Sequence, residues 1–449
     1  MKIHPNSYTL EEFLVSLSRQ HLEVVDHLVG CLACRRRFQG IVRQRSMSKK
    51  TADILLWPRK PAESCPSVPE GQTLFERERA LAKERMAAPS LFVELTRQPA
   101  EQWDLLLGSS RFHTWGLFEL LIERSLETGI HHPARGEELG LLALRLSENL
   151  DACYYGESLI EDLRARSWAY VGNSLRLRSD LQAADEAFLT AYGHLQRGTQ
   201  DPLERAILLD LEASLRRDQR QLEQAFKLLR RAVAIFLQSS QRHRAGRSLV
   251  NLSTVYHFTG EPEKGIPILF QAVELIDPEQ EPRLLLCARH NLIEYLTASG
   301  RYLEAQRVYR EARSLYRSFP DAWSQNRRKW VKGKISRGLG QAELAESLFL
   351  AARDGFIHEG IPYDTALVSL ELAALYTEQK RMADVRRLAS EMLPIFSSLH
   401  IHGEALAALT YFRQAVETET VSLALINDIA IYLRRAEYDP VLEFQKARE

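Results

Sequence analysis

The stretch AGRSLVNLSTVYHFTGEPEKGIPILFQAVELI, residues 245–276, decides the fold. Leu249, Leu252 and Tyr256 recur at helical spacing in its first half, and a second apolar stripe follows in its second half. Gly-Glu-Pro separates the halves at residues 260–262. Gly adopts the left-handed conformation that ends a helix, and Pro suits the first turn of the next one. The stretch therefore predicts two antiparallel helices joined by a short turn.

This hairpin recurs along the chain with a period of about 40 residues. A small or slim residue that lets the second helix pack closely on the first returns at spacings of 41, 40, 40, 40 and 40. A bulky column, a second alanine column and the turn glycines keep the same register. The first column contains Ala184, Ala225, Gly265, Ala305, Ala345 and Val385, and the turn glycines are Gly260, Gly300 and Gly340.

The repeated pattern resembles that of tetratricopeptide repeats, which place a bulky residue, a Leu-Gly pair, an aromatic and then Ala, Phe and Ala at fixed offsets. The best match is the set Trp168, Val171, Gly172, Leu175, Ala184, Phe188 and Ala191. The usual period is about 34 residues, so each helix here is expected to be roughly three residues longer. HEAT-type repeats share the longer period but lack this residue order, and a generic helical solenoid is the alternative. The resemblance implies an all-α, tetratricopeptide-like solenoid of helical hairpins.

Composition excludes several classes of protein. The 449 residues include 59 Lys or Arg and 59 Asp or Glu, with a pI near 7.2, so no field of the whole chain favours nucleic acid or an anionic membrane. A solenoid of this length is reasonable because each repeat packs only on its neighbours. No window is apolar enough for a membrane span, and no signal peptide is recognised. We expect a cytoplasmic protein.

A group of metal-ligating residue types lies near the N-terminus. His27, Cys31 and Cys34 stand at i, i+4 and i+7 of a helical pattern, which places them on one helix face. One imidazole and two thiolates suit Zn²⁺, and a closed structural site needs a fourth ligand, for which His4 is the first candidate. A redox-active Cys pair and simple packing of the two cysteines are the alternatives.

The same segment is similar to the zinc-finger domain of bacterial anti-sigma factors, whose signature is an upstream Cys or His followed by H-x3-C-x2-C. His4, His27, Cys31 and Cys34 fall on these positions, with His21 and Cys65 as weaker candidates upstream and downstream. The resemblance implies a bound Zn²⁺ and a sigma factor as partner. The chain departs from the membrane-tethered members of that family, because it has no transmembrane segment.

Five segments are predicted along the chain. Residues 1–45 form the anti-sigma-like zinc-finger module and the Pro-rich residues 46–72 a flexible linker. Residues 73–161 form an N-terminal cap with a diverged repeat, 162–397 six tetratricopeptide-like repeats, and 398–449 the C-terminal capping helices. The arrangement resembles a group of bacterial proteins that join such a zinc finger to a repeat array, and the likeness brings no established activity with it.

The sequence contains no motif of a catalytic site, so we expect a non-enzymatic interaction and regulatory protein. The solenoid would bind a peptide or protein, and the zinc module a transcription-related factor. The alternative is a DNA-associated regulator that uses the seven Lys and Arg residues between residues 35 and 50, so nucleic acid is kept as a less favoured partner. The oligomeric state is left open.

The tetratricopeptide resemblance places the first helix of each hairpin along a binding groove. Projecting the repeat register gives a groove stripe rich in arginine, which would favour a partner with carboxylates or phosphates. An equally acceptable interpretation is that these arginines form ordinary salt bridges with acidic residues of adjacent helices. The projected groove residues are Arg166, Arg176, Arg217, Arg247, His257, Arg327, Trp330, Lys334 and Arg337.

Overall fold

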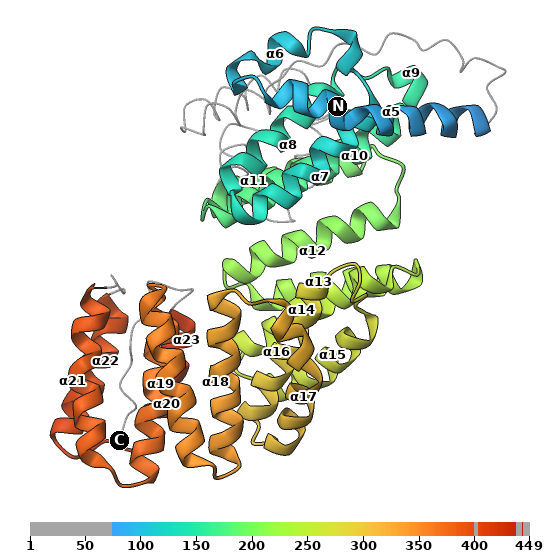
Figure 1. Cartoon of the computed structure of the whole chain (residues 1–449). Helices are drawn as coiled ribbons and strands as arrows, with labels where there is room; N and C mark the ends of the chain where they lie inside the picture. The colour runs from blue at the N-terminus through green and yellow to red at the C-terminus, as the bar shows by residue number, and fades with distance from the viewer. Residues whose placement is uncertain (1–73, 399–402, 437–441, 443–449) are drawn as a thin grey trace, which may run out of the picture. The chain divides into compact units, whose positions relative to one another are not determined.

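The computed structural model describes residues 74–398, 403–436 and 442 (Figure 1). Every regular element in these residues is a helix. The chain divides into two compact units, one ending at Arg220 and one beginning at Gln221, and each is considered by itself. None of the described helices is both long and apolar enough to cross a membrane. The predicted zinc module, the basic segment after it and the linker lie outside the described residues.

The first unit begins with helices of very different lengths and ends with long helices that pair as hairpins. Thr114 caps α7 by accepting a hydrogen bond from the backbone of Leu117, and Pro133 opens α8. Its core is built around Trp103, Phe118 and Phe188, which are almost completely buried. The helices are α5 (Leu74–Thr96), η2 (Ala100–Gln102), α6 (Trp103–Leu106), η3 (Ser110–Phe112), α7 (Trp115–His131), α8 (Pro133–Ser147), α9 (Ala152–Tyr155), α10 (Glu157–Leu177), α11 (Leu181–Leu195) and α12 (Pro202–Asp218).

The second unit consists of antiparallel helices that follow one another as hairpins (Figure 1). Four hairpins in this unit are α14–α15, α16–α17, α18–α19 and α20–α21, and their first helices begin forty residues apart. A final pair, α22 and α23, follows. The helices are α13 (Leu222–Gln238), α14 (Arg242–Phe258), α15 (Pro262–Leu275), α16 (Pro282–Ala298), α17 (Tyr302–Ser318), α18 (Ala322–Gly338), α19 (Ala342–His358), α20 (Pro362–Glu378), α21 (Met382–Ser398), α22 (Gly403–Glu417) and α23 (Leu423–Ala436).

The constant period arises from helices of 17 residues and turns of three. The middle residue of most turns has a positive φ, and the next backbone N–H reaches back to a carbonyl of the preceding helix, for example from Glu261 to Tyr256 at 2.9 Å. This is the Schellman arrangement, which satisfies the last carbonyls of a helix. The left-handed residues spaced by multiples of twenty are Arg220, Ser240, Gly260, Gly300, Gly340, Gly360 and Lys380.

The small-residue columns form the contacts between helices, as the sequence predicts. Ala305 and Ala345 of the first column and Ala312 and Ala352 of the second are 0% exposed. Their side chains add little thickness, so neighbouring helices approach closely and the larger Phe349 fills the space between them, also at 0% exposure. The prediction of an all-α, tetratricopeptide-like solenoid with helices longer than usual is confirmed.

Candidate functional site: the charged face of the first helices

Charges of opposite sign alternate across the first helices of three successive hairpins, α16, α18 and α20. Lys334 on α18 pairs with Glu294 on α16, and its Nζ lies 3.9 Å from a carboxylate oxygen of Glu371 on α20. One turn further along α18, Arg337 donates to Glu371 at 2.9 Å and to Glu378 at 2.6 Å. We call these five residues the charged ladder. It links three hairpins along one face.

Burial and ion pairing have opposite effects on the pKa of Glu294, one of the carboxylates of the charged ladder. The Lys334 side chain is 10% exposed and that of Glu294 23%. Burial raises the pKa of Glu294, but Lys334 and the other positive charges around it outweigh burial and hold that pKa at about 2. Glu294 is therefore a carboxylate at neutral pH, and Lys334 is its counter-ion.

An aromatic and ionic group adjoins the ladder on α18. One nitrogen of Arg327 donates to both carboxylate oxygens of Asp364 on α20, at 2.9 and 2.7 Å. The Arg327 guanidinium lies 5.5 Å from the ring centroid of Trp330, and the Lys334 ammonium lies 4.5 Å from the same ring. Trp330 therefore carries two cations close to its ring, which fixes both side chains.

Two histidines lie on the neighbouring first helices. The Nδ1 of His290, on α16, is 2.8 Å from the hydroxyl of Tyr316. Burial lowers the pKa of His290 to about 4, so its imidazole is neutral at pH 7 and has one donor and one acceptor nitrogen. The His257 ring, on α14, stacks on Tyr295 with 5.6 Å between ring centroids.

Several buried polar atoms of this face lack a hydrogen-bond partner among the described residues. They are Nε2 of His290, Oε1 of Glu294, Nε of Arg327 and Nε1 of Trp330. Leaving a buried donor or acceptor unpaired costs about 1–3 kcal/mol, and most such atoms in proteins are satisfied. The four atoms lie on α16 and α18 and are enclosed by their neighbours, so a molecule bound at the surface does not reach them.

The structure brings Arg327, Trp330, Lys334 and Arg337 of the predicted groove together on α18. Arg166, Arg176 and Arg217 lie on α10 and α12 of the first unit. Arg247 and His257 lie on α14. Each predicted arginine is paired with at least one carboxylate, most of them on the next hairpin. The pairs are Arg166 with Glu204, Arg176 and Arg217 with Asp218, Arg247 with Glu281, Arg327 with Asp364, and Arg337 with Glu371 and Glu378.

These ion pairs agree with the second interpretation of the sequence, in which the arginines form ordinary salt bridges with acidic residues of adjacent helices. A partner with carboxylates or phosphates would have to compete with the resident carboxylates for each guanidinium. That these residues bind a partner stays a prediction.

The sequence reading did not identify the acidic members of the face, Glu294, Glu371, Glu378 and Asp364. One signal was available, because Glu294 precedes Lys334 by forty residues, one repeat length. Residues one repeat apart occupy the same position on adjacent first helices. Opposite charges at that spacing therefore predict an ion pair between hairpins.

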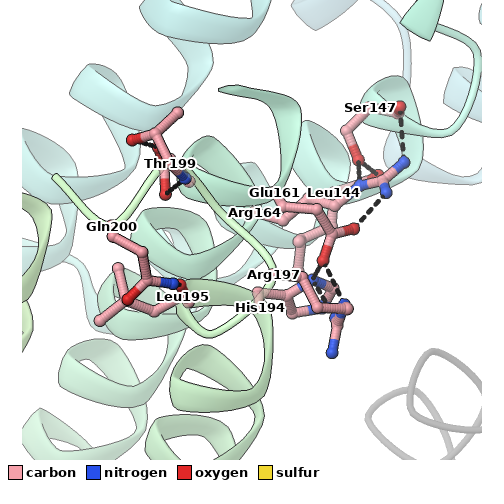
Figure 2. Close-up of polar contacts among 10 residues, drawn as sticks. Leu144, Ser147, Glu161, Arg164, His194, Leu195, Arg197, Thr199 and Gln200 are labelled. Atoms are coloured by element: carbon pink, nitrogen blue, oxygen red, sulfur yellow. Dashed lines mark hydrogen bonds and ion pairs between the residues drawn. The ribbon is translucent and has the colours of Figure 1, made fainter. Parts of the chain in front are cut away.

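A separate polar cluster lies within the first unit (Figure 2). The side chain of Glu161 is 3% exposed and accepts hydrogen bonds from Arg164 at 2.8 Å and Arg197 at 2.6 Å. His194 lies 3.0 Å away, and Arg164 also donates to the backbone carbonyl of Ser147 at 2.9 Å. Both carboxylate oxygens of Glu161 are hydrogen-bonded within the unit, so the cluster joins α8, α10 and α11.

The predicted zinc ligands, His4, His27, Cys31 and Cys34, lie outside the described residues. Within residues 74–398, 403–436 and 442, no group of three or more His, Cys, Asp or Glu side chains could hold a metal ion. The zinc site stays a prediction from the sequence.

Comparison with known proteins places part of the chain in a class of helical-repeat proteins. Residues 167–318 match the family model of the soluble NSF attachment protein, SNAP. The structure of a Rap protein complexed with competence and sporulation factor aligns with 72% of this chain and 87% of the Rap chain, with a TM-score of 0.51 and 11% sequence identity. Aspartyl phosphate phosphatase F from Bacillus subtilis aligns with 89% of this chain and 96% of its own, with a TM-score of 0.45 and 14% identity.

No curated protein sequence matches the chain. The SNAP match covers about a third of the residues, and the identity to the Rap protein is low, so the comparisons support the helical-repeat fold. None of the three similar proteins reported is a zinc-finger protein or an anti-sigma factor.

Proposed function

We propose that this chain is a non-enzymatic interaction protein that binds a peptide or protein on the charged face of α16 and α18. The exposed Trp323 on α18, with the Arg327 guanidinium 5.2 Å from its ring centroid, supports this proposal because exposed aromatic and arginine side chains are enriched at protein interfaces. The Rap protein of similar fold is complexed with competence and sporulation factor, so a repeat array of this kind can carry a bound partner.

Site-specific photo-crosslinking tests the proposal. A photoreactive phenylalanine analogue replaces Trp323, which is on first helix α18 and 41% exposed, or Leu303, which is on second helix α17 and 72% exposed. Crosslinking in the native cells should join a partner at position 323 and not at 303. A partner joined only at position 303, or at neither position, contradicts binding on the first helices.

A charge-reversal variant decides whether the arginine stripe takes part. Arg176→Glu, Arg217→Glu and Arg337→Glu together remove three guanidinium groups along the first helices. An acidic partner would bind this variant more weakly and with a smaller salt dependence. Affinity and salt dependence equal to those of the parent chain would show that the arginines serve only the ion pairs between hairpins.

We also propose that residues 1–45 bind one Zn²⁺ through His4, His27, Cys31 and Cys34 and recruit a transcription-related factor. The H-x3-C-x2-C spacing supports this proposal. Elemental analysis of the full chain should find about one zinc per chain, and Cys31→Ser should abolish it because a thiolate ligand is lost. No zinc after expression in zinc-supplemented medium contradicts the metal site.

The partner of that module is tested separately. Pairwise binding assays against each sigma factor of the source cell should identify one that binds the zinc-loaded chain. The alternative, DNA binding through residues 35–50, predicts an affinity for duplex DNA that falls steeply as salt rises. Absence of both interactions would leave the module without either proposed role.

A further inference from the structure

One arginine of α18 lies in a column of residues that is small or apolar in the neighbouring first helices. Because the first helices begin forty residues apart, Arg328 is equivalent to Ser248 on α14, Ala288 on α16 and Val368 on α20. Those three residues are 0% exposed, so the column belongs to the packing between helices. A charged side chain in such a column costs free energy unless it is paired. Packing alone therefore does not account for an arginine at position 328.

Arg328 has no resident counter-ion. Its side chain is half-buried, and among the described residues no carboxylate lies within ion-pair distance of its guanidinium and no acceptor is hydrogen-bonded to it. The adjacent Arg327, by contrast, donates to both carboxylate oxygens of Asp364. A guanidinium has five N–H donors, so that of Arg328 is available to an acceptor from another molecule.

The charge of Arg328 acts on two tyrosines of α17, which packs against α18. Burial raises the pKa of Tyr309, and the positive charges of Arg328 and Arg313 oppose this effect. Burial also raises the pKa of Tyr316, and Arg328 again opposes it. The centroids of the two tyrosine rings are 6.1 Å apart. The guanidinium of Arg328 therefore lies close to Tyr309, as does that of Arg313.

Three exposed arginines of α17 extend this basic surface. Arg310, Arg313 and Arg317 follow one another at spacings of three and four residues, which places them along one side of the helix. They span about 10 Å at 1.5 Å per residue. Among the described residues, none of the three has a carboxylate within ion-pair distance. We call these three residues and Arg328 the arginine surface.

The helices on either side of α17 in the sequence supply no free carboxylate to these arginines. One repeat length before and after the three α17 arginines, the chain has a single acid, Asp277, which accepts hydrogen bonds from the backbone of its own turn. Glu311 of α17 is one and two residues from Arg310 and Arg313, so it faces another side of the helix. The other equivalent residues are Phe270, Val273, Leu350, Arg353 and Ile357.

We propose that the arginine surface binds an acidic segment of a partner protein, with several aspartates or glutamates along its length. Guanidinium groups spaced by about one helix turn require separate anions at a similar spacing, which a run of carboxylates provides and a single phosphate group does not. Carboxylates are also the groups that pair with Arg327 and Arg337 on α18. This surface goes beyond the peptide site proposed at Trp323 and consists of different residues.

The probe is a fluorescein-labelled peptide of about eight glutamates, titrated with the full chain at low salt and measured by fluorescence anisotropy. Arg313→Gln with Arg317→Gln should weaken binding by more than about tenfold because two guanidinium groups are lost. The matched control is Arg230→Gln with Arg231→Gln, which removes two exposed arginines from α13. This control should bind the peptide within about twofold of the parent chain.

Arg328→Met tests the half-buried member of the surface, because it keeps an apolar stem and removes the guanidinium. Binding of the glutamate peptide should weaken by about threefold or more. The variant should melt at the temperature of the parent chain or higher, since an unpaired charge leaves a packed column. A lower melting temperature with unchanged binding would show that Arg328 serves the fold alone.

Three further outcomes would overturn the proposal. The first is no binding of the peptide to the parent chain, and the second is an equal loss in the α13 control, which indicates general charge attraction. The third is tighter, arginine-dependent binding of an oligothymidylate of equal length or of phosphatidylserine vesicles, which would assign the surface to nucleic acid or a membrane. Leu303 lies about 10 Å before Arg310 along α17 and outside the arginine surface, so the crosslinking test on α18 is judged separately.

Discussion

Lys334 is the direct counter-ion of the largely buried Glu294 carboxylate on α16. Replacing it with Met in Lys334→Met removes the direct counter-ion of Glu294. We expect a destabilisation of about 1–3 kcal/mol in urea unfolding, less than for a fully buried pair because Glu294 is 23% exposed.

The pH dependence of that effect has a definite sign. The pKa of Glu294 is lowered from its ordinary 4.5 to about 2, so its pairing stabilises the fold above pH 4.5 and loses this effect as the pH falls toward 2. The difference between parent and Lys334→Met should therefore be largest above about pH 5 and shrink in acid. The control is Lys227→Met, in an exposed i, i+4 pair with Glu223, which should change little. A constant difference from pH 6 down to about pH 3 would exclude this role of Lys334.

The left-handed turn residues give a second prediction. Ser240 has φ of 58°, a conformation that costs an L-residue about 1 kcal/mol, so Ser240→Gly should raise the unfolding free energy by up to about 1 kcal/mol. Gly300→Ala should lower it by a similar amount, since a Cβ there meets no neighbour within 4 Å and the effect is purely that of the backbone. Thermal melts of both variants measure this, and changes of the same sign would contradict it.

Sequence reasoning found half of the charged face. Arg327, Lys334 and Arg337 could be projected onto it because each stands at a fixed distance from the alanine column. The carboxylates that neutralise them lie on the adjacent helices, and pairing depends on how far neighbouring helices are offset along their axes. That offset is determined by the packing of side chains between helices, and the periodicity within a single helix does not predict it.

At the scale of the helix, the backbone of α18 at Gly333 lies close to the aromatic ring of Phe349 on α19. A Cβ built there would lie 2.6 Å from a ring carbon of the fully buried Phe349. We expect Gly333→Ala to destabilise the chain by about 1–3 kcal/mol, although alanine favours a helix by about 1 kcal/mol.

The matched control is Gly193→Ala on α11. There the nearest atom to an added Cβ is in the Arg197 side chain at 3.7 Å, an ordinary van der Waals distance, so only the gain in helix propensity remains. Urea unfolding should show a small stabilisation at position 193 and a loss at position 333. Equal effects at both positions would show that Phe349 moves without cost.

Helix boundaries were predictable where the turn carries a glycine. Gly260, Gly300 and Gly340 were recognised from the sequence and all have positive φ. Ser240 and Lys380 take the same conformation without a glycine signal, because the surrounding Schellman hydrogen bonds impose it. The packing of α23 on α20 could not be predicted either, since an apolar stripe does not specify which neighbour will cover it.

At the scale of the whole molecule, the constant repeat length predicts which deletions the array tolerates. Removing residues 282–321 deletes α16 and α17 with their turns and joins the loop after α15 to the start of α18. Each hairpin contacts mainly its neighbours, so the shortened chain should keep its helical content per residue and melt cooperatively at a lower temperature.

Removing residues 302–321 is the control. It deletes only α17 and its turn, so α18 would follow α16 directly. A helix with the packing residues of a first helix would then occupy the position of a second helix. Circular dichroism should show loss of helix and a broad melt. Similar behaviour of the two deletions would mean that hairpin order does not govern stability.

The left-handed residues at multiples of twenty also have a consequence for the gene. Forty codons encode one complete hairpin, and neighbouring hairpins share most of their columns. Unequal recombination between two such segments inserts or removes a unit of forty codons, which preserves the reading frame and leaves every remaining helix with a partner. Such a gene can lengthen or shorten its product in whole hairpins, so homologues should differ in size by multiples of this unit and carry their irregular insertions at the ends of the array.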